Sequence, residues 1–194
     1  MNRKISSAIS VFVGLTCVLV AGVVSLAQSS VRSNAQSAKP VIYTTTPKLA
    51  IAKLKSGESN LYDVRGKAAF TVTAANDNDT VAGTLVYTIP DDARQKIAQL
   101  SAKPLASIPA SVAKKDVIAG FQSGTACPVV NLEIGATELE VAGVKLRFNR
   151  ITLDVIETAD QVPQHFCAWT RQINAKRPRR GIIASLNRLL TGEQ

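Results

Sequence analysis

A strand hairpin is predicted by the alternation of hydrophobic and polar residues between positions 70 and 89. Apolar residues alternate with threonines over residues 70–74, which is the period of a strand with one buried face. Residues 76–79 are all Asn or Asp and predict the turn, because these residues tolerate left-handed backbone. A four-residue turn predicts three cross-strand pairs: Phe70 with Leu85, Val72 with Gly83, and Ala74 with Val81. One face of the hairpin would then hold Phe70, Leu85, Tyr87 and Ile89.

A three-stranded meander is predicted over residues 129–157. Gly135-Ala136 fits a two-residue turn with glycine first, and Ala142-Gly143 would make the second turn. These turns predict the pairs Val141 with Val144, Leu139 with Leu146, Leu132 with Leu139, Glu140 with Lys145, and Glu138 with Arg147. In the third strand the parity of the apolar residues changes at Asn149-Arg150. A β-bulge there would keep both halves on one face, and a turn is the alternative.

Weaker patterns complete the fold prediction. Residues 48–55 and 116–121 are candidate strands, and residues 56–60 have the composition of a turn. A helix is predicted to begin at Pro90-Asp91-Asp92, to carry Ala93, Ile97 and Leu100 on one face, and to end before Pro104. We therefore expect a mainly β, β-rich α+β domain: an antiparallel sheet, sandwich or partial barrel of six or seven strands, with one or two short helices and a C-terminal helix.

Residues 171–194 combine a basic run with an amphipathic helix. The basic residues, which no acidic residue interrupts, are Arg171, Lys176, Arg177, Arg179 and Arg180. The apolar residues that share one helical face are Ile182, Ile183, Leu186, Leu189 and Leu190, and Gly192 is placed to cap the helix. Such a segment can lie on an anionic membrane surface. We expect instead that the helix docks on the sheet, since a sheet of this size needs helices to cover it, and that the arginines bind anions.

The first 27 residues have the layout of a secretory signal peptide. Arg3 and Lys4 precede an uncharged run, and Ser25-Leu26-Ala27 places small residues at the −3 and −1 positions of a cleavage site. The run is long enough to span a bilayer, so an uncleaved anchor is the alternative. Either way the rest of the chain is expected to be exported, to the periplasm or out of the cell. Residues 28–40 predict a disordered spacer before a single β-rich domain at residues 41–170.

The formal net charge of +9 is carried mainly by the two ends of the chain. Arg3 and Lys4 contribute +2, residues 28–170 carry only +2, and residues 171–194 carry +5. The predicted domain is therefore not strongly basic. Because export is predicted and no nucleic-acid-binding motif is present, nucleic acid is not an expected partner.

Few residues are available for catalysis or metal binding. The chain has three cysteines and one histidine, His165, which speaks against zinc sites that need four such ligands. Cys127 and Cys167 remain after the signal peptide, and in an oxidising compartment they predict a disulfide rather than a catalytic thiol. We interpret His165 as a partly buried packing residue, because the sequence offers it no partner. Asp77 and Asp79 fail the EF-hand calcium pattern and are assigned to the turn.

These observations predict an exported, non-enzymatic binding or structural module of the cell envelope, without catalytic residues, cofactor or metal. Its basic segment would contact anionic lipid, polysaccharide or an acidic partner protein. One alternative is a carrier of an apolar ligand or lipid, for which small residues on the strands would leave a cavity. The other is an enzyme that uses carboxylates or His165, for which the sequence gives no positive support.

Overall fold

The predicted hairpin lies at the centre of the sheet. The computed structural model describes residues 39–56 and 59–193. Strands β3 (Ser59–Asn76) and β4 (Thr80–Thr88) form the hairpin. Two of its three predicted pairs are confirmed: Phe70 with Leu85, and Val72 with Gly83. The predicted buried face is confirmed as well, because Phe70, Leu85, Tyr87 and Ile89 are at most 3% exposed.

The third predicted pair, Ala74 with Val81, is wrong. β3 has a bulge between Val72 and Ala74, so Val81 faces Ala75 instead. The turn is also shorter than predicted, because Asn76 still belongs to the strand. The extra residue in the bulge keeps both Val72 and Ala75 buried on the two sides of the irregularity.

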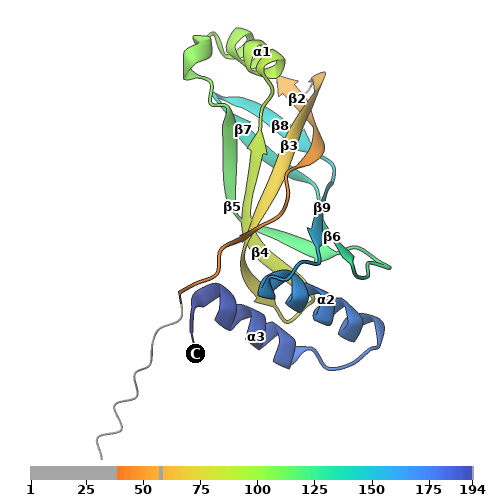
Figure 1. Ribbon diagram of the computed structural model, residues 1–194. Coiled ribbons are helices and arrows are strands. Elements are labelled where there is room, and N and C mark those ends of the chain that lie inside the picture. Colours follow the sequence, from red (N-terminus) through yellow and green to blue (C-terminus); the bar gives the residue numbers. More distant parts are fainter. Residues whose placement is uncertain (1–38, 57–58, 194) are drawn as a thin grey trace, which may run out of the picture. The chain divides into compact units, whose positions relative to one another are not determined.

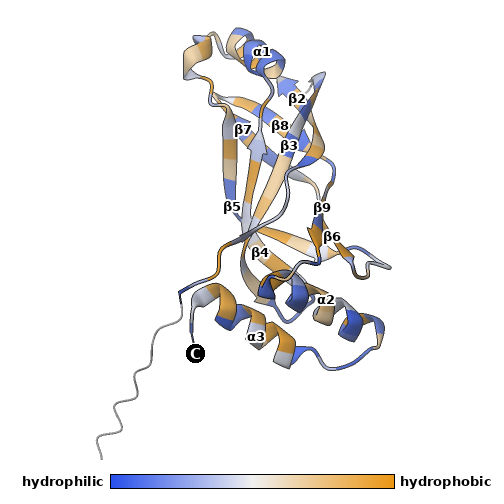
Figure 2. Ribbon diagram, in the orientation of Figure 1, coloured by the Kyte–Doolittle hydropathy of each residue, from blue (hydrophilic) through white to orange (hydrophobic). Residues whose placement is uncertain are grey.

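Nine antiparallel strands form one sheet that curls into a half-barrel (Figure 1). The other strands are β1 (Tyr43–Thr44), β2 (Lys48–Ser56), β5 (Ser111–Phe121), β6 (Val129–Ile134), β7 (Thr137–Val141), β8 (Val144–Phe148) and β9 (Ile151–Ile156). Their order is β7-β8-β2-β3-β4-β5-β6-β9, and β1 pairs with β3. Hydrophobic and hydrophilic residues alternate along much of the sheet (Figure 2). The predicted β-rich class is confirmed, with more strands than the six or seven expected.

The curl brings each end strand against a strand from the middle of the sheet. Lys48 on β2 forms an ion pair of 2.7 Å with Asp154 on β9. Lys114 on β5 reaches β7, where it donates to Oγ1 of Thr137 at 2.9 Å and to the backbone oxygen of Glu138 at 3.3 Å. These contacts therefore join each end strand of the sheet to a strand from its middle.

The predicted meander is wrong at its first turn. β6 pairs with β5 and β9 rather than with β7, so Leu132 faces Leu153 and not Leu139. The second turn is right, and four predicted pairs of the β7–β8 hairpin are confirmed: Val141 with Val144, Leu139 with Leu146, Glu140 with Lys145, and Glu138 with Arg147. The reason for the error is that both edges of β6 are occupied by other strands, which leaves the β7–β8 hairpin to pair with β2.

Asn149-Arg150 is a turn between two strands, as the alternative prediction had it. β8 ends at Phe148 and pairs with β2, whereas β9 begins at Ile151 and pairs with β6. The chain therefore changes partner at this point, and no bulge is needed. The apolar residues on both sides of the turn are nonetheless buried, as expected: Val144, Leu146, Phe148, Ile151, Leu153 and Val155.

Helices cover the two ends of the sheet (Figure 1). Helix α1 (Asp91–Ser101) begins where predicted and buries Ala93 and Ile97, and a 3-10 turn (Leu105–Ser107) follows it. Helices α2 (Gln161–Asn174) and α3 (Arg180–Thr191) lie together at the opposite end. α3 was predicted and α2 was not, and the expected boundary between residues 170 and 171 falls inside α2.

Aromatic rings cover two glycines of the central strands. A Cβ atom on Gly66 would lie 2.5 Å from the ring of Tyr87, and one on Gly83 would lie 2.6 Å from the ring of Phe70. Both rings are fully buried. The space over these two glycines is therefore filled by aromatic side chains of the protein itself. The alternative function, a carrier of an apolar ligand, stays a prediction.

The predicted signal peptide or anchor at residues 1–27 lies outside the described residues, as do residues 28–38 of the predicted spacer. Lys39 and Pro40, at the end of that spacer, belong to no helix or strand. In the described part of the chain, no helix has the length and hydrophobicity to cross a bilayer.

Candidate functional site

Four of the five predicted anion-binding residues gather where α2 ends and α3 begins. We call Lys176, Arg177, Arg179 and Arg180 the basic connector. Together with Asp77, Pro178 and Ile183 they line a surface pocket of about 540 Å³. The fifth residue, Arg171, lies in the last turn of α2 and pairs with Glu157 at 3.8 Å, so it does not line this pocket.

The basic connector begins with a Schellman motif that ends α2. The backbone nitrogen of Arg177 donates to the oxygen of Gln172 at 2.9 Å, and that of Lys176 donates to Ile173 at 3.0 Å. Lys176 has a φ of 54°, the left-handed conformation in which this motif usually has glycine. Pro178 then prevents the helix from continuing. The local sequence thus forces a tight turn in which the basic side chains are close neighbours.

Asp79, in the turn between β3 and β4, holds the basic connector to the sheet. Its Oδ1 atom lies 2.8 Å from Nε of Arg179 and accepts a hydrogen bond of 3.1 Å from Nε1 of Trp169. The backbone of Asp79 is left-handed, with a φ of 58°, which aspartate tolerates. Sequence reasoning placed Asp79 in the turn but missed this role, because no local spacing links it to a tryptophan 90 residues later.

The pocket carries a net positive charge. Lys176, Arg177 and Arg180 are exposed, and none of them has an acidic partner within 4.0 Å among the described residues. Asp77 is the one acidic residue among those that line the pocket, and it is exposed. The first turn of α3 has no acidic residue and no side-chain cap, so its free N–H groups add partial positive charge.

The apolar face of α3 is docked on the sheet, as expected. Ile183, Leu186 and Leu190 are buried, and Ile182 and Leu189 are partly buried. The amide of Asn187 accepts a hydrogen bond of 2.7 Å from the nitrogen of Ala75 and donates one of 2.9 Å to its oxygen. Gly192 caps the helix with a φ of 74°. Ile183, Leu186 and Leu190 therefore belong to the core rather than to a free membrane-binding face.

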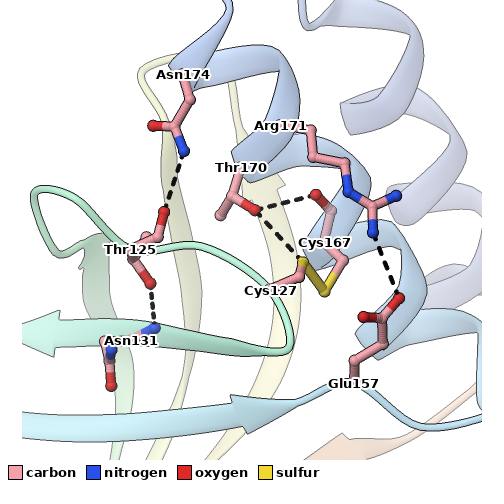
Figure 3. Close-up of a disulfide and its surroundings, with 8 residues drawn as sticks. All are labelled: Thr125, Cys127, Asn131, Glu157, Cys167, Thr170, Arg171 and Asn174. Atoms are coloured by element: carbon pink, nitrogen blue, oxygen red, sulfur yellow. Dashed lines mark hydrogen bonds and ion pairs between the residues drawn. A yellow bond between two sulfur atoms is a disulfide. The ribbon is translucent and has the colours of Figure 1, made fainter.

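The predicted disulfide between Cys127 and Cys167 is present and ties α2 to the segment that leads into β6 (Figure 3). Thr125 joins the same two elements, because its Oγ1 accepts from the nitrogen of Asn131 at 2.6 Å and its backbone oxygen accepts from Asn174 at 3.2 Å. The helix that carries the basic connector is thus fixed to the sheet by a covalent bond and by hydrogen bonds.

The two cysteines of the disulfide also belong to a group of three described residues whose ligand atoms are close enough to hold a metal ion. Both sulfur atoms and a carboxylate oxygen of Glu157 lie within 4.8 Å of one another. Metal binding would require free thiolates, and here the two sulfurs are bonded to each other. Glu157 instead pairs with Arg171.

His165 is partly buried on α2, as predicted, but it has two partners that the sequence did not reveal. Its Nδ1 atom lies 2.8 Å from the backbone oxygen of Gln161, and its Nε2 atom lies 2.9 Å from Oγ of Ser185 on α3. Ser185 lines a second surface pocket, of about 520 Å³. No signal in the sequence links a serine and a histidine that lie on two different helices.

Comparison of the chain with protein-family models, with curated proteins and with solved structures gave no match.

Proposed function

We propose that this chain is an exported module of the cell envelope that binds anionic surfaces through the basic connector. One observation carries the proposal. Lys176, Arg177 and Arg180 are three exposed cations, without an acidic partner among the described residues, on a single tight turn. Arginine side chains form paired hydrogen bonds with phosphate, sulfate and carboxylate groups, which are the charged groups of anionic lipids and polysaccharides.

The position of this turn is fixed before any ligand binds. Arg179 is held by Asp79, and α2 is held by the disulfide from Cys167. A preformed site loses less conformational entropy on binding than a flexible basic tail, so more of the electrostatic attraction appears as affinity. The arrangement favours a specific binding site over a solvated basic linker.

The proposed contact depends on charge rather than on insertion of a helix. Ile183, Leu186 and Leu190 are buried against the sheet, so α3 has no free apolar face to place in a bilayer. Binding should therefore weaken as salt screens the charges. The export part of the proposal rests on the N-terminal sequence and on the disulfide, which suits an oxidising compartment.

Cosedimentation with lipid vesicles tests the proposal. We expect the protein to bind vesicles that contain phosphatidylglycerol, and not vesicles of phosphatidylcholine alone, with affinity that falls as sodium chloride is added. The triple variant K176Q/R177Q/R180Q should bind about a hundredfold more weakly, since each surface cation contributes about 1 kcal/mol on an anionic membrane.

The matched control removes the same charge elsewhere. Lys96, Lys103 and Lys115 are exposed and lie outside the pocket, so K96Q/K103Q/K115Q should keep the wild-type affinity. Equal losses of vesicle affinity in the two variants would show that binding depends only on the net charge of the protein. This result would overturn a binding site at the basic connector. A heparin column with the same variants separates a polysaccharide ligand from a lipid one. Recovery of the protein from the cytoplasm of its host would overturn the export part.

A further inference from the structure

Ser185 on α3 and His165 on α2 share a hydrogen bond whose direction is set by a third group. Nδ1 of His165 lies 2.8 Å from the backbone oxygen of Gln161, and Nε2 lies 2.9 Å from Oγ of Ser185. A carbonyl oxygen can only accept, so the proton of the neutral imidazole is on Nδ1. Nε2 is then an acceptor, and the hydroxyl of Ser185 donates to it. A serine nucleophile needs this arrangement: a base within hydrogen-bond distance that another group orients.

Ser185 lines a pocket and is not fully enclosed between the helices. Ser185 is partly exposed, and the pocket of about 520 Å³ lies where α3 meets the N-terminal end of α2 and the segment before β1. That segment is bound to α3 by a hydrogen bond of 2.9 Å from the nitrogen of Val41 to the oxygen of Leu189. The charged and apolar side chains that line the pocket are Lys39, Arg188, Glu193, Val41 and Leu189.

We propose that Ser185 and His165 form a catalytic pair that hydrolyses carboxylic esters with an anionic group. Two cations against one carboxylate, that of Glu193, favour a substrate with a negative charge. Val41 and Leu189 provide apolar surface for a short acyl chain. This pocket is separate from the one that the basic connector lines, so ester hydrolysis here is independent of anion binding there.

The chemistry needs only the ester and water. Oγ of Ser185 forms a bond to the carbonyl carbon of the ester while its proton passes to Nε2 of His165. The tetrahedral intermediate then expels the alcohol, which takes that proton, and an acyl group remains on the serine. Water then forms a bond to the acyl carbon while one of its protons passes to Nε2. The bond from this carbon to Oγ of Ser185 breaks, Oγ takes the proton back from Nε2, and the carboxylic acid leaves. Lys39 and Arg188 are the charged groups of the pocket that can offset the negative charge of the intermediate.

Labelling with an alkyl fluorophosphonate tests the pair, because this reagent phosphonylates activated serines. We expect one adduct per chain, located at Ser185 by peptide mass spectrometry. Ser185→Ala should remove it. Ser101→Ala is the matched control, since Ser101 also lies in a helix but its hydroxyl bonds a backbone oxygen at 2.7 Å and no imidazole. This variant should label at the wild-type rate.

His165→Ala should slow the labelling at least about a hundredfold, the usual contribution of a general base. Added imidazole should restore part of the rate, which a purely structural histidine would not allow. Circular dichroism checks that the variant is folded, and His165→Gln is the second variant if it is not. Absence of an adduct at Ser185, or an adduct that forms at the same rate without His165, would overturn the proposal.

Two 4-nitrophenyl esters test the substrate class. We expect turnover of the anionic hydrogen succinate ester to exceed that of the neutral butyrate ester. Arg188→Gln should lower kcat/KM for both esters, because Arg188 also offsets the charge of the intermediate. The decrease should be at least about fivefold larger for the succinate ester than for the butyrate ester. Equal rates for the two esters in the wild type would overturn the preference for an anionic group.

Discussion

The carboxylate of Asp79 lies 2.8 Å from the guanidinium group of Arg179 and accepts a hydrogen bond from the indole of Trp169. One acidic residue in a β-turn therefore fixes both α2 and the basic connector that follows it. It also neutralises one of four neighbouring cations, which lowers their mutual repulsion. The three remaining cations can then face solvent together.

Two substitutions of Asp79 should separate the effect of its hydrogen bond on stability from the effect of its charge. Asp79→Ala leaves the buried indole of Trp169 without an acceptor, and we expect a loss of about 1–3 kcal/mol in the free energy of unfolding. Asp79→Asn keeps an oxygen and tolerates the left-handed backbone, so it should cost less than about 1 kcal/mol. Urea unfolding followed by fluorescence measures both, because Trp169 is the only tryptophan of the chain. Equal losses would contradict the role given to the hydrogen bond.

Lys176→Gly should stabilise the protein and weaken anion binding at the same time. Lys176 has a φ of 54° at the end of α2, and glycine adopts this conformation without strain. We expect a net gain of about 0.5–1 kcal/mol in the free energy of unfolding, because the strain of about 1–2 kcal/mol that glycine relieves exceeds the entropy that it adds to the unfolded chain. The lost cation should weaken vesicle binding several-fold. A variant that gains stability but binds vesicles as the wild type does would show that Lys176 takes no part in the site.

Local pairings could be predicted from the sequence, whereas pairings between distant strands could not. Turn length and alternation set the register of the β7–β8 hairpin, and they set most of the β3–β4 register. The same alternation shows which face of β6 is buried, but it carries no information about which strand lies beside it. Leu132, which is buried, was therefore predicted to face Leu139, whereas it faces Leu153.

In the candidate site, too, local features could be predicted from the sequence and contacts between distant elements could not. The cations of the basic connector and the docking of α3 could be predicted, because both depend on spacing within a short segment. Helix α2 was missed although Val162, Phe166, Trp169 and Ile173 have helical spacing, which is the signal that could have revealed it. The partners Asp79 and Ser185 come from elements that only the tertiary fold brings to α2.

Gly66→Ala and Gly83→Ala should both be strongly destabilising. At each position a Cβ atom would lie 2.2 Å from a backbone oxygen and would also meet the aromatic ring that covers the glycine. The strands would have to move apart, so we expect losses of about 3 kcal/mol or more in the free energy of unfolding. Gly120→Ala is the matched control within β5, because nothing lies within 4 Å of its added Cβ. It should change the free energy of unfolding by less than about 0.5 kcal/mol.

Tyr87 should make the fold sensitive to alkali. Its hydroxyl is buried, donates to the backbone oxygen of Val64 at 3.0 Å and accepts from the nitrogen of Gly66 at 2.8 Å. Burial raises the pKa of Tyr87 from 10.0 to about 12. In the unfolded chain the phenol ionises near its ordinary pKa, so the unfolded state binds fewer protons than the folded state between pH 10 and 12. The contribution of Tyr87 to stability is therefore complete below pH 10 and is lost as the pH rises toward 12.

Tyr87→Phe separates these effects. At pH 7 the variant should be about 1–3 kcal/mol less stable, because the nitrogen of Gly66 loses its acceptor in the core. Between pH 10 and 12 the wild type should lose more of its stability than the variant does. Urea unfolding at a series of pH values measures the difference, and parallel losses in the two proteins would show that Tyr87 does not titrate in this range.

Removal of the disulfide should destabilise the fold and act first on α2. Cys127 and Cys167 are separated by 40 residues, and closure of a loop of this size restricts the unfolded chain by about 3–4 kcal/mol. We expect the variant C127A/C167A to lose about this much in urea unfolding, and a reducing agent to destabilise the wild type but not the variant. Amide hydrogen exchange should rise most over residues 161–174, because this helix would keep only its noncovalent contacts to the sheet. An equal rise in exchange throughout the sheet and α2 would mean that the disulfide stabilises the whole domain. It would then have no special role in holding the helix that carries the basic connector.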